Sequence, residues 1–158
     1  MVALVVGLSA LYVSLKQTRL SQHTQKYELY ENRLKVYSAF VELFDVVSLQ
    51  MNRIDGTDRK PYILVFKNWI DTHGKFMQGT RHVQLLFEGD IQKYQKQVDD
   101  KSVVIIMHYS RLVSFASNEE ERRKIIKDLE KIFDWCKSER DSLEDKFDHY
   151  LNIGNLNP

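Results

Sequence analysis

Between Leu8 and Asp55 the sequence contains neither proline nor glycine. These two residues disfavour a continuous helix more than any others, so this stretch can form a single long helix. Only two prolines and six glycines occur among the 158 residues, and apolar residues recur at three- and four-residue spacing in the rest of the chain. The sequence therefore predicts an all-α protein with one domain of ordinary size.

The N-terminal segment from Val2 to Leu15 is apolar and uncharged, and Lys16 and Arg19 follow it directly. Its length of about 14 residues is below the roughly 20 that cross a bilayer, although bilayer thinning and a snorkelling lysine extend its reach. A cleavable signal peptide would need a basic segment before the apolar run and a small-residue cleavage site after it, and the sequence shows neither feature. We therefore expect a membrane anchor over residues 1–16, and the alternative is a core helix buried within a bundle.

Basic residues cluster on the C-terminal side of this segment, at Lys16, Arg19, Lys26, Arg33 and Lys35. The positive-inside rule places such a flank in the cytoplasm. The expected location is therefore an inner membrane, with the C-terminal domain in the cytoplasm.

A heptad pattern follows the apolar segment. Mostly apolar or aromatic residues recur every seven positions in two rows that are three residues apart, a spacing typical of a coiled-coil seam. The rows are Leu20, Tyr27, Leu34, Val41 and Ser48, and His23, Tyr30, Tyr37, Phe44 and Met51. A second stripe widens the apolar face in the later part of the helix, through Leu29, Val36, Phe40, Leu43 and Val47. We expect that later part to pack within its own chain, and residues 16–27 to contact another subunit of a homo-oligomer.

Three more helices are expected after a loop at residues 52–60. Pro61 suits the first turn of a helix that ends near Met77, and Asp90 can cap the next helix. Ser117 and Asn118 open the last helix, which should run unbroken to Gly154. The predicted domains are the anchor at 1–16, a cytosolic bundle of about four helices at 17–153 and a tail at 154–158. The expected core residues of the three helices after the loop follow in chain order. They are Tyr62, Phe66, Trp69, Ile70, His73 and Phe76 in the first, Ile91, Tyr94, Val98, Ile105, His108, Leu112 and Phe115 in the second, and Ile125, Leu129, Ile132, Cys136, Leu143, Phe147 and Tyr150 in the third.

The chain lacks the usual patterns of enzyme sites. It has no glycine-rich phosphate loop, no His-Glu-x-x-His motif, no nucleophile elbow and a single cysteine, Cys136. We expect Cys136 to be a buried apolar residue and the protein to be no enzyme, with no metal and no cofactor. The net charge of +1 gives no reason to expect binding to a DNA or RNA duplex.

One segment between helices groups cationic side chains with glycines. Lys75, Arg81 and His82 are the candidate ligand-binding residues, and Gly74 and Gly79 could admit a close approach of backbone to a phosphate. An ordinary interhelical loop is the alternative. The competing cationic site lies in the first interhelical loop, at Arg53, Arg59 and Lys60.

The segments Leu85–Tyr94 and Asp128–Leu151 resemble small uncharacterised bacterial proteins that have an N-terminal membrane helix and a helical tail with Trp, Phe and Tyr-Leu in order. Size and layout also resemble the accessory membrane effectors of type III CRISPR systems. That resemblance implies an oligomer that binds cyclic oligoadenylate in antiviral defence, at a bacterial inner membrane. It supplies no motif that transfers residue by residue.

The sequence is compatible with three functions. The first is a non-enzymatic, oligomeric membrane effector whose helical domain senses a ligand such as a cyclic oligonucleotide. The second is a membrane-tethered scaffold that recruits a partner protein through the heptad seam. The third is a hydrolytic toxin with an unfamiliar helical fold.

Overall fold

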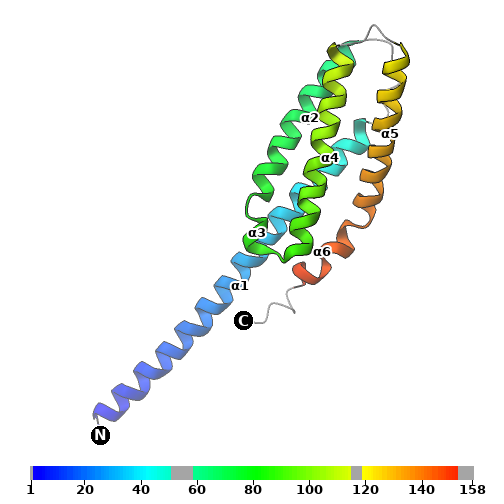
Figure 1. Cartoon of the computed structure of the whole chain (residues 1–158). Helices are drawn as coiled ribbons and strands as arrows, with labels where there is room; N and C mark the ends of the chain where they lie inside the picture. The colour runs from blue at the N-terminus through cyan, green and yellow to red at the C-terminus, as the bar shows by residue number, and fades with distance from the viewer. Residues whose placement is uncertain (1, 51–58, 115–118, 153–158) are drawn as a thin grey trace.

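The structure is a computed structural model that describes residues 2–50, 59–114 and 119–152, and these residues form six helices and no strand. Figure 1 shows the helices in chain order. They are α1 (Val2–Gln50), α2 (Arg59–Thr80), α3 (Val83–Leu86), α4 (Gly89–Ser114), α5 (Glu119–Asp141) and α6 (Leu143–Leu151). The prediction of an all-helical fold is confirmed.

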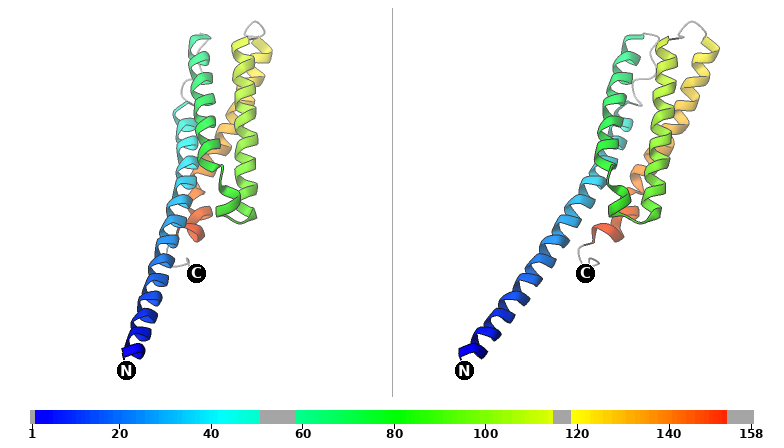
Figure 2. Two further views of the ribbon diagram at one scale, coloured as in Figure 1. Left: turned by 90° about the vertical axis from the view of Figure 1, so that its left-hand side faces the viewer. Right: turned by 60° about the vertical axis from the view of Figure 1, so that its left-hand side comes forward.

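Four long helices build a bundle. Helix α1 packs against α2 and α5, and α4 also packs against α2 and α5, so each long helix has two neighbours around a common core. The short helices α3 and α6 lie at the end of the bundle where α1 leaves it, as Figures 1 and 2 show. This end is called the base of the bundle below.

Helix α1 has two different parts. It is 49 residues long, which at 1.5 Å per residue gives about 74 Å. Every side chain from residue 11 to residue 25 is exposed, and this part extends beyond the bundle (Figure 2). The later part buries Val36, Phe40, Leu43 and Val47 in the core. The core face therefore combines the second predicted stripe with the later heptad-row residues Tyr37, Val41 and Phe44. The earlier seam residues Leu20, Tyr27 and Leu34 are exposed.

The predicted core faces of the other helices are largely confirmed. All seven residues expected on α5 and α6 are buried, and so are Trp69 and Phe76 on α2. Ile70 is an exception at 46% exposure, whereas its neighbour Trp69 is buried and donates a hydrogen bond to Ser102 of α4. Val65 and Tyr109 are buried without having been predicted. Phe115 and Met51 lie outside the described residues.

The prediction of one unbroken last helix was wrong. Helix α5 ends at Asp141 and α6 begins at Leu143, with Ser142 at φ −96° and ψ 2° between them. The Ser142 hydroxyl donates to the carbonyl oxygen of Glu139 at 3.3 Å, a local bond that competes with regular helix geometry. The break turns α6 at the base, where Phe147 and Tyr150 pack on Phe87.

Helix α2 is longer than predicted, because it continues through Gly79 to Thr80. A Cβ atom at Gly79 would lie 2.6 Å from the Cβ of Ala39 on α1. The glycine thus allows α1 and α2 to approach closely, and this contact holds the last turn of α2 in place. Tertiary packing outweighs the weak helix propensity of glycine here.

Among the described residues, no helix has an apolar stretch that is both long and hydrophobic enough to cross a membrane.

Candidate anion-binding site

The three predicted ligand-binding residues lie together at the base of the bundle. Lys75, Arg81 and His82 line one open groove of about 1070 Å³ between α1, α2 and α3. Helix α1 contributes Lys35, which was not among the predicted site residues. The complete lining is Asn32, Lys35, Val36, Lys75, Gln78, Gly79, Arg81, His82, Leu85 and Leu86. No acidic residue belongs to this lining, so the groove has a positive character. It is called the basic groove below.

Local structure fixes where each cation lies. Lys75 is on the last two turns of α2, whereas Arg81 and His82 form the turn into α3, in which the backbone N–H of Leu85 donates to the carbonyl oxygen of His82 at 2.9 Å. The segment is therefore mostly helix, and the prediction of an interhelical loop holds only for its last two residues.

The role predicted for Gly79 was wrong. The space beside Gly79 is filled by Ala39 of α1, so it is not open to a ligand. Open space surrounds Gly74, but this residue lies inside α2, where backbone N–H groups bond to the preceding turn. Recognition of an anion in the basic groove would therefore depend on side chains.

The cations differ in how free they are. The Lys75 ammonium group lies 2.7 Å from the carboxylate of Asp71, and this hydrogen bond, with the charge of the carboxylate, raises the pKa of Lys75. The Nε of Arg81 donates to Nε2 of His82 at 2.8 Å, which orients the guanidinium and leaves its other nitrogens available. Neither Arg81 nor Lys35 forms an ion pair within the described residues. These two residues are the strongest anion-binding candidates.

Arg81 also lines a second open groove of about 640 Å³ between α2 and α4. Lys93 and Lys96 lie there, and the acidic residue in that lining, Asp99, is held by His73. Arg81 thus lies between two cationic surfaces. Sequence reasoning missed Lys35, Lys93 and Lys96, because only the packing of α1 and α4 against α2 brings them near Arg81.

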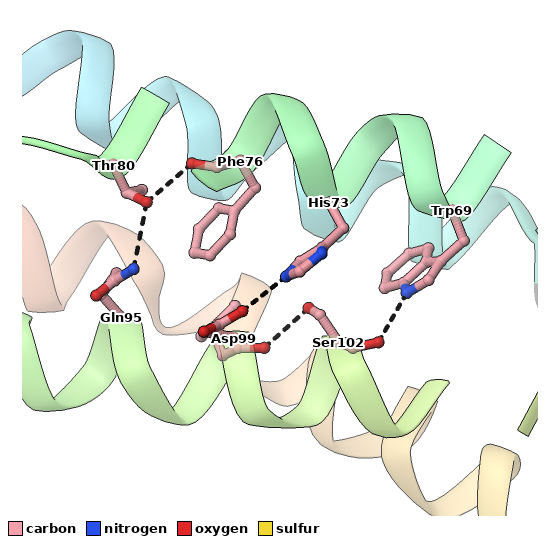
Figure 3. A network of polar contacts seen from close by, with 8 residues as sticks. Trp69, His73, Phe76, Thr80, Gln95, Asp99 and Ser102 are labelled. Carbon is pink, nitrogen blue, oxygen red and sulfur yellow. Dashed lines mark hydrogen bonds and ion pairs between the residues drawn. The ribbon is translucent and has the colours of Figure 1, made fainter. Parts of the chain in front are cut away.

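A row of polar contacts joins α2 to α4 beside this second groove (Figure 3). Nε1 of Trp69 donates to the carbonyl oxygen of Ser102 at 3.1 Å, and Nε2 of His73 lies 2.7 Å from Oδ1 of Asp99. Gln95 donates to the Thr80 hydroxyl at 3.4 Å. These bonds set the position of α2 along α4, so His73 has a structural role, as predicted for a core histidine with one hydrogen-bond partner.

His108 differs from His73, although both were predicted as core histidines with one partner. Its Nδ1 atom is buried and has no hydrogen-bond partner within the described part of the chain. Burial lowers the pKa of His108, which favours the neutral ring.

Metal chemistry receives no support from side-chain clusters. In residues 2–50, 59–114 and 119–152, no three His, Cys, Asp or Glu side chains gather closely enough to hold a metal ion.

The competing cationic site lies at the other end of α2. Arg59 and Lys60 are in its first turn, and Arg53 lies outside the described residues. The basic groove is at the opposite, C-terminal end of that helix, so the two sets of cations cannot form one site.

No family model matches the sequence, and neither a curated protein nor a solved structure is significantly similar to it. The resemblances drawn from Leu85–Tyr94, from Asp128–Leu151 and from the layout therefore stay predictions. The case for a function depends on the geometry of this chain.

Proposed function

We propose that this protein is a non-enzymatic, oligomeric sensor that is tethered to a membrane and binds a small anionic ligand. The observation that carries the proposal is the basic groove, in which Lys35 of α1 faces the same space as Arg81 and His82 after α2. Helix α3, which contributes Leu85 and Leu86 to the groove lining, lies where α1 leaves the bundle (Figure 1). A ligand bound both by Lys35 of α1 and by Arg81 after α2 would change the angle between α1 and the bundle.

The side chains suit a phosphate group. A guanidinium can donate two parallel hydrogen bonds to one phosphate, and an ammonium adds a point charge. Arg81 and Lys35 supply these two groups from different helices. A small ligand with several phosphates is favoured over a duplex, since the net charge of the chain is only +1. A cyclic oligonucleotide is the first ligand to test.

The ligand proposal can be tested by titration calorimetry of the full chain with cyclic oligoadenylate. Loss of a charge-assisted hydrogen bond costs about 1.5–3 kcal/mol, so Arg81→Ala should weaken binding about tenfold or more. Arg123→Ala is the matched control, because Arg123 is an exposed arginine on α5 that pairs with Glu119. Unchanged affinity in Arg81→Ala removes the basic groove from the proposal, and a loss in Arg59→Ala moves the site to the start of α2.

Binding must also be shown for the unmodified chain. If cyclic oligoadenylate gives no heat and no thermal shift, it is not the ligand. Inorganic triphosphate in the same assay then reports whether the groove recognises phosphate at all.

The proposed tether is the apolar segment that ends at Leu15. Its last residues, Leu11, Tyr12, Val13 and Leu15, are exposed large apolar side chains at the far end of a projecting helix. The following positive charges suit anionic lipid head groups. We propose that this segment inserts into the bacterial inner membrane and that the bundle stays in the cytoplasm.

Flotation with vesicles of a zwitterionic and an anionic phospholipid tests the tether. The full chain should float with the vesicles, and the double change Leu11→Asp and Leu15→Asp should leave it in the soluble fraction. Gln25→Asp is the control, because it adds a negative charge to the same projecting helix beyond the apolar segment. Equal flotation of both variants argues against insertion of residues 11–15.

A membrane-tethered scaffold is the second candidate function. It is favoured by the exposed apolar row on α1, which could hold a different protein. The scaffold predicts flotation but no binding of a nucleotide, so the two assays above separate it from the sensor.

A further inference from the structure

The projecting part of α1 has an apolar row that no other part of the described chain covers. Val13, Leu20, Tyr27 and Leu34 follow one another at seven-residue spacing, and their exposed fractions are 52%, 60%, 61% and 39%. This row is called the α1 seam below. Single exposed apolar residues are common on proteins, but a regular row on a helix that leaves its own bundle needs a partner surface.

The spacing defines what kind of partner fits. A straight α-helix has 3.6 residues per turn, so a row of every seventh residue drifts around it by about 20° per heptad. Two helices that supercoil around each other keep such a row in contact. From Val13 to Leu34 the α1 seam spans three heptads, or about 32 Å at 1.5 Å per residue.

We propose that the α1 seam binds the same seam of a second copy, as a parallel, in-register, two-stranded coiled coil. The inference rests on the proposed function, which states that the protein is an oligomer. It adds which surface the subunits share, how their helices are oriented and in which register they pair. In a parallel pair each seam residue meets its own equivalent, so the four apolar layers stay together. In an antiparallel pair the seam would meet the row three residues further on, which includes Lys16 and His23, so apolar and polar residues would share a layer. A parallel pair keeps Lys16 and His23 in layers of their own, opposite their equivalents.

Charges beside the seam favour the same orientation. In a parallel pair Lys26, which precedes Tyr27, lies opposite Glu31 of the partner subunit, and this opposite-charge pair forms twice. An antiparallel pair would instead place Lys26 near Lys26 of the partner subunit. The like charges would destabilise that arrangement.

The bundle leaves the seam accessible. Leu34 is exposed, whereas Val36, two residues later, is buried and marks the opposite side of α1. Val41, the next residue at the heptad spacing, is partly buried against the bundle core. The seam is therefore open along the projecting part of α1. It ends at Leu34, which also lines an open groove with Lys75 and Gly79 of α2, where the helix enters the bundle.

Cysteine cross-linking of the full chain tests both orientation and register. Val13→Cys and Leu34→Cys lie at the two ends of the seam, and Cys136 is buried and stays as a constant background. With copper phenanthroline as oxidant, each variant should form a disulfide-linked dimer. Ser21→Cys and Gln25→Cys, exposed on other faces of the same helix, are the controls. They should react at least about tenfold more slowly, because a disulfide needs Cα atoms within about 7 Å.

Each alternative gives a different result. Cross-linking at neither end of the seam, or equal cross-linking at Ser21→Cys and Gln25→Cys, overturns the proposal. Light scattering should give the mass of two copies for the unmodified chain and of one copy for Leu20→Asp, with helicity unchanged. A mass of three or more copies excludes the two-stranded form. Flotation and calorimetry do not depend on these cross-links, so failure of the tether or of ligand binding is distinguishable from failure of the dimer.

Discussion

Arg33 donates a hydrogen bond from Nη1 to the backbone carbonyl oxygen of Tyr150, 117 residues later in the chain, at 3.2 Å. Its Nε donates to the carbonyl oxygen of Leu86 at 3.0 Å. Both carbonyls lie in the last turn of a short helix, α6 and α3, where the helix itself leaves acceptors without a partner. The guanidinium also lies over the rings of Phe87 and Tyr150, 5.7 Å and 5.4 Å from their centroids. Arg33 therefore fastens the base of the bundle to α1.

The first prediction concerns this residue. Arg33→Ala should lower the free energy of unfolding by about 2 kcal/mol, because hydrogen bonds from a charged donor to two carbonyls are lost. Arg33→Lys should lose part of that amount, since an ammonium lacks the planar fork that reaches both carbonyls. Urea unfolding followed by circular dichroism measures the change. Arg19→Ala, on the exposed part of α1, should stay within about 0.5 kcal/mol of the unmodified chain. Equal stability of the Arg33 and Arg19 variants would show that Arg33 does not fasten the base.

The second prediction compares two glycines of α2. Gly79→Ala places a Cβ 2.6 Å from the Cβ of Ala39, so α1 and α2 must move apart at a typical cost of about 1–3 kcal/mol. Gly74→Ala meets no atom within 4 Å and should stabilise the helix by about 0.5–1 kcal/mol. The two melting temperatures should therefore change in opposite directions. Adding Ala39→Gly to Gly79→Ala exchanges the two residues and should restore part of the lost stability. A Gly79→Ala variant more stable than the unmodified chain would contradict the close contact between α1 and α2.

The third prediction is a pH dependence of stability from His108. Burial lowers the pKa of His108, the charge of Arg111 lowers it further and Asp128 opposes the shift. The unfolded chain binds this proton at the ordinary pKa of 6.5, and the folded chain only at lower pH. The stabilising contribution is therefore complete above pH 6.5 and is lost as the pH falls through the lower folded pKa. In unfolding experiments from pH 5 to pH 8, His108→Leu should flatten this slope. An unchanged slope would assign it to other groups.

The fourth prediction concerns the reactivity of Cys136. The thiol is buried, and burial together with the charge of Glu139 raises the pKa of Cys136 to about 12. Only the thiolate reacts with alkylating agents, so the folded chain should react with iodoacetamide far more slowly than the chain in urea. The ratio of the two rates, followed by mass spectrometry, reports how often the α5 region opens. Rapid reaction of the folded chain would contradict the burial of this side chain.

Much of the core follows from apolar periodicity. The spacing of Ile125, Leu129, Ile132 and Cys136 identified the buried face of α5, because a helix repeats its surface every 3.6 residues and charged residues fill the other positions. Ile70 did not follow the pattern. Ile70 and Trp69 are neighbouring apolar residues, and the sequence does not show which of them faces another helix. In the structure Trp69 is buried and bonds to Ser102 of α4, and Ile70 is exposed.

The candidate site was predicted in part. Lys75, Arg81 and His82 are close in sequence, and the structure brings them to one groove. Lys35 could not be added from the sequence, since it lies on a different helix. The prediction for Gly79 was wrong for a related reason. A glycine in the sequence indicates that something approaches the backbone closely, but it does not show whether that is a ligand or another helix.

The sequence by itself determined the helices, because local propensity and periodicity are properties of neighbouring residues. It also determined the seven-residue row on α1 and the concentration of basic residues after the apolar segment. Tertiary structure decided which residues of the two apolar stripes of α1 enter the core and which cations share the basic groove. Each of these outcomes depends on contacts between residues far apart in the chain, such as Gly79 with Ala39 and Arg33 with Tyr150. Their geometry exists only after the helices have packed together.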